Sequence, residues 1–399
     1  MIKKIKVEQL EPGMYIHDMN CGWMDHPFMT NSLKVKNEKM IEKIIGNGIK
    51  DVYIDTEKGL DVDDAPTAEE VSQEIQEELN KMADLRSPEV RKASIKDELV
   101  KAREIKKEAK KAVYDIMEDV RFGKPLKADK VEKVVDKMID SIFRNQDALI
   151  SLARIKQTDE YTYMHSMGVC VLMISFSRHL GLNKGELKHA AVGAMLHDIG
   201  KMKVPLELLN KKSGLTDDEF EIIKTHVEHS RNLLKETKGI DELSVTLASQ
   251  HHERLNGRGY PGGLKGDEIS VFGKAAAIVD VYDAMTSQRC YQRKSEPTEV
   301  LRKLYEWKDS YSMELVQQFV RCIGIYPVGT VVRLDNGLLG VVLDHGKENL
   351  LQPLVRIVYD SQKSRQVMPY DLDLEERREN RVEGYEVPEK WGIRPEVYL

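Results

Sequence analysis

Between residues 161 and 325 the apolar residues recur at spacings of three and four, as in amphipathic helices, and no comparable strand pattern interrupts them. An unbroken series of helices predicts an all-helical domain for this part of the chain. The helix after Thr216 has a capping box with Glu219, which fixes its register. We expect helices over residues 164–180, 184–196, 217–236, 243–252, 272–287, 297–307 and 313–323.

Smaller units flank this domain. Short apolar pieces with turn signals surround one helix over residues 38–45, which indicates a small α/β module. A long amphipathic helix over residues 95–120 has an apolar stripe that packs either on the neighbouring domain or on a second copy of the chain in a homodimer. After residue 327 the period becomes two, and Asp335-Asn336-Gly337 predicts a hairpin, followed by a strand over residues 354–359 and a charged tail that wraps or frays.

The sequence thus predicts a mainly α protein in four parts. A small α/β module occupies residues 1–65, and a linker with amphipathic helices occupies residues 66–145. The helical domain with the candidate site residues follows at residues 146–326, and a short β appendage with its tail at residues 327–399.

The net charge and the spacing of the cysteines indicate which class of partner and which cellular compartment to expect. The net charge is -6, whereas a general DNA- or RNA-binding protein is basic, so polymeric nucleic acid is disfavoured as a partner. No stretch reaches the length of about eighteen apolar residues that a membrane span needs, and the N-terminus has no secretory apolar region. The four cysteines form no C-x-x-C pair, so we expect them to be reduced thiols. We therefore expect a cytoplasmic protein.

Histidines and aspartates gather on the expected helices. The apolar run over residues 190–196 delivers His197 and Asp198 to a helix end, where Gly200 permits a turn and Lys201 adds a cation. A lone histidine on an apolar face is usually a hydrogen-bonded core residue, but a set of seven candidates indicates a metal site. The candidates are His165, His197, Asp198, His226, His251, His252 and Asp280.

Imidazole and carboxylate donors without sulfur suit iron, manganese or nickel, with zinc as an alternative. Two such ions about 3.5–4 Å apart form the usual clamp for displacement at phosphorus, which predicts a phosphoester substrate. A glycine-rich segment follows His252 over residues 253–264, and Arg254 and Arg258 give it positive charge. We expect it to be a ligand-facing loop, although a plain surface turn has the same composition.

The other histidines are given structural roles. His17 and His26 are interpreted as polar loop residues around Trp23, and His229 as a supporting or surface residue. Asp283 shares a helical face with Asp280, so it is a candidate for orienting a ligand through a hydrogen bond. The remaining three histidines receive no role in the site: His179, His189 and His345.

Two motifs carry a family resemblance. His197-Asp198-Ile199-Gly200-Lys201 and the segment from His251-His252 to Gly259-Tyr260-Pro261 resemble the HD-GYP family, the cyclic di-GMP phosphodiesterases of the HD superfamily of metal-dependent phosphohydrolases. The similarity covers residues 161–325 and implies an all-helical HD-type catalytic domain. Residues 7–15 are similar to the opening of a small domain that often precedes this catalytic domain.

The resemblance implies roles for individual residues. It makes the seven candidates the ligands of two divalent metal ions, with Asp198 as the bridging carboxylate, and it places Lys201 beside the scissile phosphate. Asp198 and Lys201 are thus the expected catalytic residues. It also implies that the loop around Tyr260 meets the GGDEF diguanylate cyclases. The expected substrate contacts are Arg258, Gly259, Tyr260, Pro261 and Arg289.

Two positions depart from the family pattern. Members with a third metal have an acidic ligand four residues before His165, where this chain has Tyr161, and Glu160 is one residue out of register. Two metals are therefore expected, which by resemblance favours opening cyclic di-GMP to linear pGpG over complete cleavage to GMP. Gln292 replaces a basic residue of the family, although the next two residues are basic.

The leading hypothesis is a phosphodiesterase that hydrolyses cyclic di-GMP by attack of a metal-bridging hydroxide. One alternative is an HD hydrolase of another nucleotide, such as a guanosine polyphosphate or a different cyclic dinucleotide, and the GYP loop argues against it. The other is a scaffold that binds diguanylate cyclases without hydrolysis. The presence of all seven ligands argues against that alternative.

Overall fold

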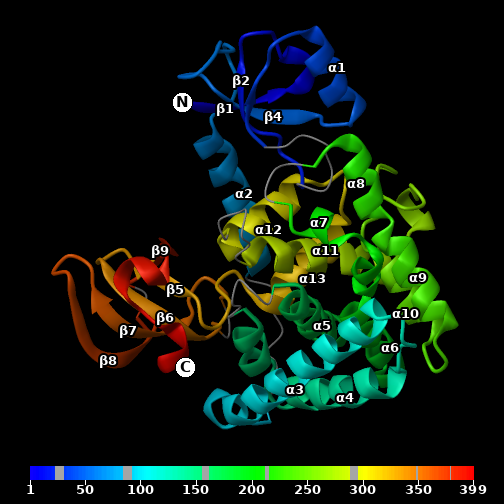
Figure 1. The fold of residues 1–399 in the computed structure, drawn as a ribbon. Coiled ribbons are helices and arrows are strands. Elements are labelled where there is room, and N and C mark those ends of the chain that lie inside the picture. Colours follow the sequence, from blue (N-terminus) through cyan, green and yellow to red (C-terminus); the bar gives the residue numbers. More distant parts are fainter. Residues whose placement is uncertain are drawn as a thin grey trace.

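A helical body lies at the centre of the molecule, with a small α/β module at one end and a β-sheet beside it (Figure 1). The computed structural model describes residues 1–22, 31–83, 92–154, 161–211, 215–287, 295–346, 349–377 and 379–399. None of the described helices is both long and apolar enough to cross a lipid bilayer. The helices of the body are α3 (Ile95–Arg121), α4 (Ala128–Arg154), α5 (Tyr161–His179), α6 (Lys184–Leu196), α7 (Leu206–Leu209), α8 (Asp217–Lys224), α9 (His226–Glu236), α10 (Glu242–Gln250), α11 (Val271–Thr286), α12 (Pro297–Glu306) and α13 (Met313–Ile323).

The helical prediction for this region is confirmed except in three places: α7 was not predicted, α4 has a kink at Asn145, and one predicted helix is divided. Residues 217–236 form two helices, because the chain divides at Thr225. The Thr225 hydroxyl donates to the Ile222 carbonyl at 2.7 Å at the end of α8, and α9 begins at His226. The capping box of Thr216 and Glu219 is present as expected.

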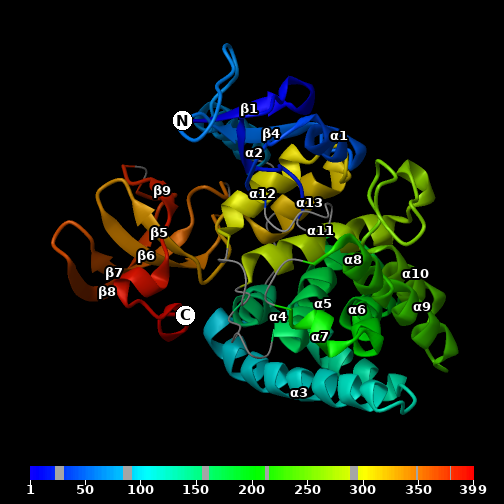
Figure 2. The same cartoon turned by 45° about the horizontal axis from the view of Figure 1, so that its top comes forward.

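Helices α3 and α4 form a hairpin that runs along the helical body (Figure 2). The stripe of α3, which includes Leu99, Val113 and Val120, is buried in the same core as α5 and α6. Of the two alternatives, the stripe therefore packs within its own chain. Glu98 is buried beneath the hairpin, where the guanidinium of Arg144 donates to its carboxylate at 2.6 Å.

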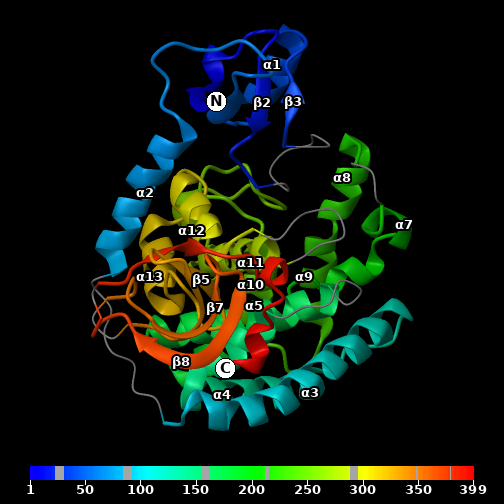
Figure 3. The same ribbon diagram turned by 90° about the vertical axis from the view of Figure 1, so that its left-hand side faces the viewer.

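The N-terminal module is an antiparallel sheet in the order β1-β4-β2-β3, with a separate hydrophobic core under α1 (Glu38–Gly46). Helix α2 (Ala68–Ala83) leads from this module to the helical body and packs on α12 and α13 (Figure 3). The sheet and α1 confirm the predicted small α/β module. The strands are β1 (Ile2–Lys6), β2 (Tyr15–Asp18), β3 (Leu33–Lys34) and β4 (Asp51–Asp55).

The C-terminal part is a five-stranded antiparallel sheet in the order β8-β7-β6-β5-β9. The predicted hairpin and third strand are present, and of the two alternatives for the tail it wraps onto the sheet, where it supplies the unpredicted strand β9. Arg333 of β5 pairs with Glu386, and Trp391 donates to the same carboxylate at 2.8 Å, which fastens the charged segment. The strands are β5 (Val331–Leu334), β6 (Leu338–Asp344), β7 (Leu354–Asp360), β8 (Arg365–Asp373) and β9 (Val382–Tyr385).

Candidate metal centre

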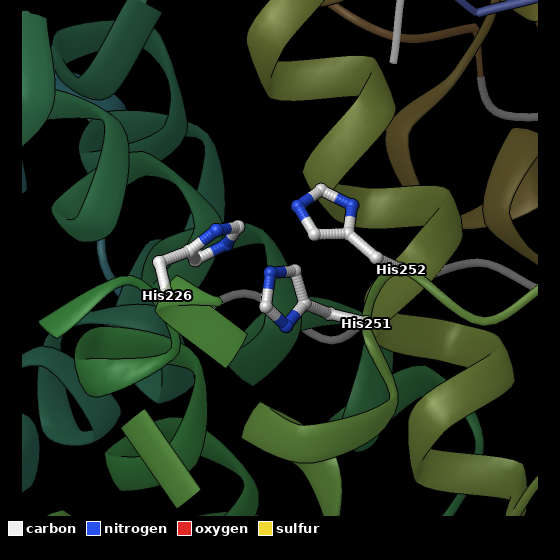
Figure 4. A group of neighbouring side chains, drawn as sticks. All are labelled: His226, His251 and His252. Atoms are coloured by element: carbon white, nitrogen blue, oxygen red, sulfur yellow. The ribbon is translucent and has the colours of Figure 1, made fainter. Parts of the chain in front are cut away.

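The seven metal-ligand candidates come from five helices and lie together inside the helical body. Three of them lie at helix ends, since His197 follows α6, His226 opens α9 and His251 follows α10. Figure 4 shows the rings of His226, His251 and His252 converging on a common space. All seven side chains are buried. Sequence separation therefore does not prevent these residues from meeting.

The ligand atoms form three overlapping groups, each with its atoms within 4.8 Å of one another. The groups join into one centre because His197 and His251 each belong to two of them. They are His226, His251 and His252; His165, His197 and Asp280; and His197, Asp198 and His251.

Asp198 lies between the two sides of this centre. Its Oδ1 is 3.2 Å from Nε2 of His226, while its Oδ2 is 3.4 Å from Nε2 of His197 and 3.8 Å from Nε2 of His165. On the His165 side, Asp280 Oδ1 is 2.9 Å from the same imidazole nitrogen. One carboxylate thus faces both halves of the site, which is the geometry a bridging ligand needs.

Hydrogen bonds on the far side of the rings fix the imidazole tautomers. Nδ1 of His197, His226 and His251 lies 2.7–2.8 Å from the carbonyl three residues earlier, and a carbonyl only accepts, so Nδ1 is the donor. Each Nε2 points into the cluster and, in the neutral form of the ring, carries the lone pair. Among the described residues these three nitrogens have no hydrogen-bond partner. Buried imidazole nitrogens without a hydrogen-bond partner are suited to act as ligands of a bound cation.

Electrostatics also fit a cation. Burial and the neighbouring His197 lower the pKa of His251 to about 3, and burial with His251 holds the pKa of His252 well below its usual range. Both imidazoles are therefore neutral at pH 7, the form that binds metals. Burial alone would raise the pKa of Asp198, but Lys201 and His197 lower it, so this carboxylate is charged.

Gly200 brings the His-Asp motif against α9. A side chain at this position would place its Cβ only 2.0 Å from the His226 carbonyl oxygen. Its backbone N–H donates to the Ser230 hydroxyl at 2.9 Å. The glycine of the motif is thus required for the close approach that puts His226 beside Asp198.

The glycine-rich loop is tied to the His251-His252 pair by Glu253, a residue that the sequence analysis missed. Its buried carboxylate accepts from the N–H groups of Gly262 at 2.7 Å and Leu264 at 2.9 Å. Tyr260 then lies over the His252 ring, with the centroids 4.7 Å apart. A carboxylate directly before a run of glycines, whose N–H groups need acceptors, was the signal in the sequence.

Family models match two parts of the chain. The description "HD domain" applies to residues 137–315, and a domain of unknown function, DUF3391, matches residues 2–131. A cyclic di-GMP phosphodiesterase of Pseudomonas aeruginosa is 35% identical over 396 residues, which are 99% of this chain and 94% of that protein. The chain belongs to the HD-GYP family of cyclic di-GMP phosphodiesterases.

Other relatives match a smaller share of the chain. A cyclic di-GMP phosphodiesterase of Thermotoga maritima is 33% identical over 184 residues, 46% of this chain and 50% of that protein. The 3'3'-cGAMP-specific phosphodiesterase 1 of Vibrio cholerae is 34% identical over 154 residues, 39% of this chain and 36% of that protein. Relatives with different cyclic dinucleotides in their names are thus similar to this chain over part of its length.

The candidate residues of this HD-GYP protein other than the seven metal ligands do not all lie at the centre. Lys201 pairs with Oδ2 of Asp198 at the centre, and Arg258 is exposed on the loop. Arg254 does not offer its charge to a ligand as expected, because it is buried over the Tyr311 ring and donates to backbone carbonyls. His229 lies outside the three ligand groups. Several residues fall outside the described part of the chain: Trp23, His26, Glu160, Arg289, Gln292 and the side chain of Tyr161.

Asp283 is placed for the orienting role predicted for it, since its Oδ2 lies 2.7 Å from Nδ1 of His165. We expect Asp283→Asn to lower metal affinity about 10–100-fold, because the His165 tautomer is no longer held by a carboxylate. Titration of the metal-free protein with Mn²⁺ measures the change. Asp241→Asn is the matched control, since Asp241 pairs with His189 on the surface and asparagine also caps α10. Equal affinities in the two variants would contradict this role.

Proposed function

We propose that this HD-GYP protein hydrolyses cyclic di-GMP to linear pGpG at a centre of two divalent metal ions. The observation that carries the proposal is the meeting of five imidazoles and two carboxylates, buried together, with Asp198 facing both halves. The full-length similarity to a cyclic di-GMP phosphodiesterase supports the substrate. We propose iron, manganese or nickel as the ions, with zinc as an alternative, because the donor set has no sulfur.

The residues divide the work between metal and substrate. His165, His197, Asp198 and Asp280 would hold one ion, and His226, His251 and His252 with the second oxygen of Asp198 would hold the other. Bound divalent ions supply a nucleophilic water at neutral pH and neutralise phosphate charge. The chain itself holds the two carboxylates ionised and His251 and His252 neutral, so that the site accepts cations without first losing protons from these groups.

The mouth of the site would bind the nucleotide. Lys201 lies beside Asp198 with its side chain 24% exposed, so its ammonium can reach both the centre and a bound phosphate. We propose that Arg258, Gly259, Tyr260 and Pro261 contact the rest of the ligand, with Tyr260 fixed against His252. We propose that Arg289 also contacts the nucleotide, because the resemblance to the family implies it. Docking of a GGDEF diguanylate cyclase on the exposed Arg258 and Pro261 is proposed on the same ground.

A second substrate has a specific observation in its favour. The Vibrio cholerae relative that is named for 3'3'-cGAMP is 34% identical over 154 residues, close to the 33% identity of the Thermotoga maritima cyclic di-GMP phosphodiesterase over 184 residues. We therefore propose 3'3'-cGAMP as a slower substrate of the same centre.

Product analysis tests the proposal. Protein loaded with Mn²⁺ or Fe²⁺ without oxygen is incubated with cyclic di-GMP, 3'3'-cGAMP or a guanosine tetraphosphate, and the products are separated by liquid chromatography. We expect pGpG to accumulate from cyclic di-GMP, slower cleavage of 3'3'-cGAMP and no cleavage of the tetraphosphate. A protein that holds two ions per chain and leaves cyclic di-GMP intact would overturn the proposal. Direct formation of GMP without pGpG would overturn the product assignment.

A further inference from the structure

The base of the glycine-rich loop is held by bonds that do not involve the metal centre. The Leu255 N–H donates to the Ser310 carbonyl at 3.0 Å, in the turn after α12. Asn256 and Lys265 form an isolated antiparallel bridge, which closes the loop across its base. The base therefore has its own support, and the tip over residues 257–264 is held separately.

The tip is folded back onto the chain segment that carries two of the metal-ligand candidates. A Cβ on Gly259 would lie 2.4 Å from the Arg254 nitrogen and 2.4 Å from the Glu253 Cα, so only glycine allows this close approach. The Tyr260 N–H donates to the His252 carbonyl at 3.2 Å. The tip thus lies directly against the backbone that follows α10.

Glu253 makes the strongest of the polar contacts with the tip. Its side chain is buried, and each of its two carboxylate oxygens accepts one backbone N–H, from Gly262 and from Leu264. Hydrogen bonds to a carboxylate are about twice as strong as those between neutral backbone groups. The ammonium of Lys224 also lies over the Tyr260 ring, 5.6 Å from its centroid, but that lysine is partly exposed, and such a contact is weaker.

Tyr260 in this position faces one half of the proposed metal centre. Its ring centroid is 4.7 Å from that of His252 and 6.4 Å from that of His226, and these two imidazoles belong to one ligand group (Figure 4). The tyrosine is only partly buried, so it is open to a bound ligand. A ligand with one phosphate at the centre would meet Tyr260 with atoms beyond that phosphate.

We infer that Glu253 is a positioning residue that sets substrate specificity: its carboxylate holds the tip so that Tyr260 meets the part of a cyclic dinucleotide beyond the scissile phosphate. The inference rests on the proposed function for its substrate, and it assigns no contact of Glu253 with the ligand. Loss of this carboxylate releases the tip and leaves the metal ligands and the loop base in place. Binding of a cyclic dinucleotide then weakens, whereas a small phosphodiester that reaches only the ions is unaffected.

Two variants disturb the clamp in different ways. Glu253→Gln keeps the size of the side chain, but the amide has one acceptor oxygen and turns its NH₂ group toward the second backbone N–H. Gly262→Ala leaves the carboxylate in place and crowds it, since a Cβ on Gly262 would lie 3.1 Å from Oε1 of Glu253. Gly262 is exposed, so this variant should fold even if the buried substitution is not tolerated.

Glu268→Gln is the matched control. Oε2 of Glu268 also accepts a backbone N–H, from Lys265 at 2.8 Å, at the start of η4 (Gly266–Glu268), but this glutamate is exposed and lies beyond the loop base. Tyr260→Leu removes the ring and leaves the clamp intact. It shows the largest effect that Glu253 can have if it acts through Tyr260.

Two phosphodiesters are compared on the full-length, metal-loaded proteins. For cyclic di-GMP we expect KM to rise about tenfold in Glu253→Gln, as for the loss of one aromatic contact, and in the same direction in Gly262→Ala, with kcat within about twofold. For bis(p-nitrophenyl) phosphate, a diester with a single phosphate, both constants should stay within about twofold of wild type. The double variant of Glu253→Gln and Tyr260→Leu should be no worse than Tyr260→Leu.

Amide hydrogen exchange reports on the tip without substrate. Over residues 257–264, exchange should be faster in Glu253→Gln and Gly262→Ala than in wild type and Glu268→Gln, because the two N–H groups lose their acceptor. Exchange in α10 and α11 should not change. Metal content should be the same in all four proteins.

Each outcome decides the inference. Unchanged KM for cyclic di-GMP or unchanged exchange of the tip in both clamp variants would overturn it, as would effects that add in the double variant with Tyr260→Leu. An equal loss on both diesters, or a loss of metal, would also overturn it, since Glu253 would then act on the centre itself. If the wild-type protein leaves cyclic di-GMP intact, the proposed function fails, but the exchange comparison still decides whether Glu253 holds the tip.

Discussion

Asp198→Ala should abolish hydrolysis of cyclic di-GMP, lowering kcat by about a thousandfold or more, and should empty the metal centre. Asp198 is the single carboxylate that faces both halves of the ligand cluster, so its loss removes a donor from each ion. In the variant, Asp280 would be the only carboxylate among the seven candidates left to offset the positive charge of two divalent cations. Without bound ions, the chain has lost the electrostatic stabilisation on which such displacements depend.

Metal content per chain and turnover are measured on the same preparation. Asp140→Ala is the control, because Asp140 is an exposed aspartate in the middle of α4 and its replacement should leave both quantities unchanged. Retained turnover in Asp198→Ala protein that holds no metal would show that the ligand cluster is not the catalytic centre. A variant that keeps its metal but loses turnover would show that Asp198 acts in catalysis and is not needed to hold the ions.

Lys201→Met should lower kcat by about 100–1000-fold, with the metal content preserved. Methionine keeps most of the volume and removes only the positive charge beside Asp198. Removal of one preorganised group that stabilises developing negative charge costs a factor of this size in other enzymes. The measurement is single-turnover hydrolysis of cyclic di-GMP, together with metal analysis of the variant.

Lys203→Met is the matched control for this variant. Lys203 lies in the same short 3-10 segment, η3 (Ile199–Lys203), but its side chain is exposed. Its loss should leave kcat unchanged. A Lys201→Met protein that also loses its metal would indicate that the ammonium acts by holding Asp198 in place, and a variant with normal kcat would remove Lys201 from the mechanism.

Local patterns predicted most of the helical body, because each helix carries its own spacing and its own caps. The helix over residues 184–196 was predicted with its observed bounds, since Asn183 caps its start and the His-Asp motif ends it. The break at Thr225 was missed, because a threonine hydroxyl that bonds a carbonyl in the preceding turn leaves no periodic trace. The strand β9 was missed because it is only four residues long and its partner β5 lies about fifty residues earlier.

The candidate site divides in the same way. His197, Asp198, His251 and His252 were found because they occur in motifs, whereas Glu253 acts through its carboxylate on backbone N–H groups about ten residues later, which spacing does not reveal. The hydrogen bond from the Tyr53 hydroxyl of the N-terminal module to Glu306 of α12 was equally inaccessible. It depends on how two separately folded parts pack, and neither sequence segment contains a sign of the other.

The hairpin of α3 and α4 has a consequence for how such proteins are assembled in evolution. The similarity to the HD domain begins at residue 137, inside α4, while the match to the preceding domain ends at residue 131 and so includes α3. Yet Leu99, Val113 and Val120 of α3 share one hydrophobic interior with α5 and α6. A recombination event at that boundary would expose this interior to water. An exchange ahead of residue 95 would keep α3 but would still remove Leu79 of α2 from the same interior, so the unit that must be inherited together is longer than the shared catalytic sequence.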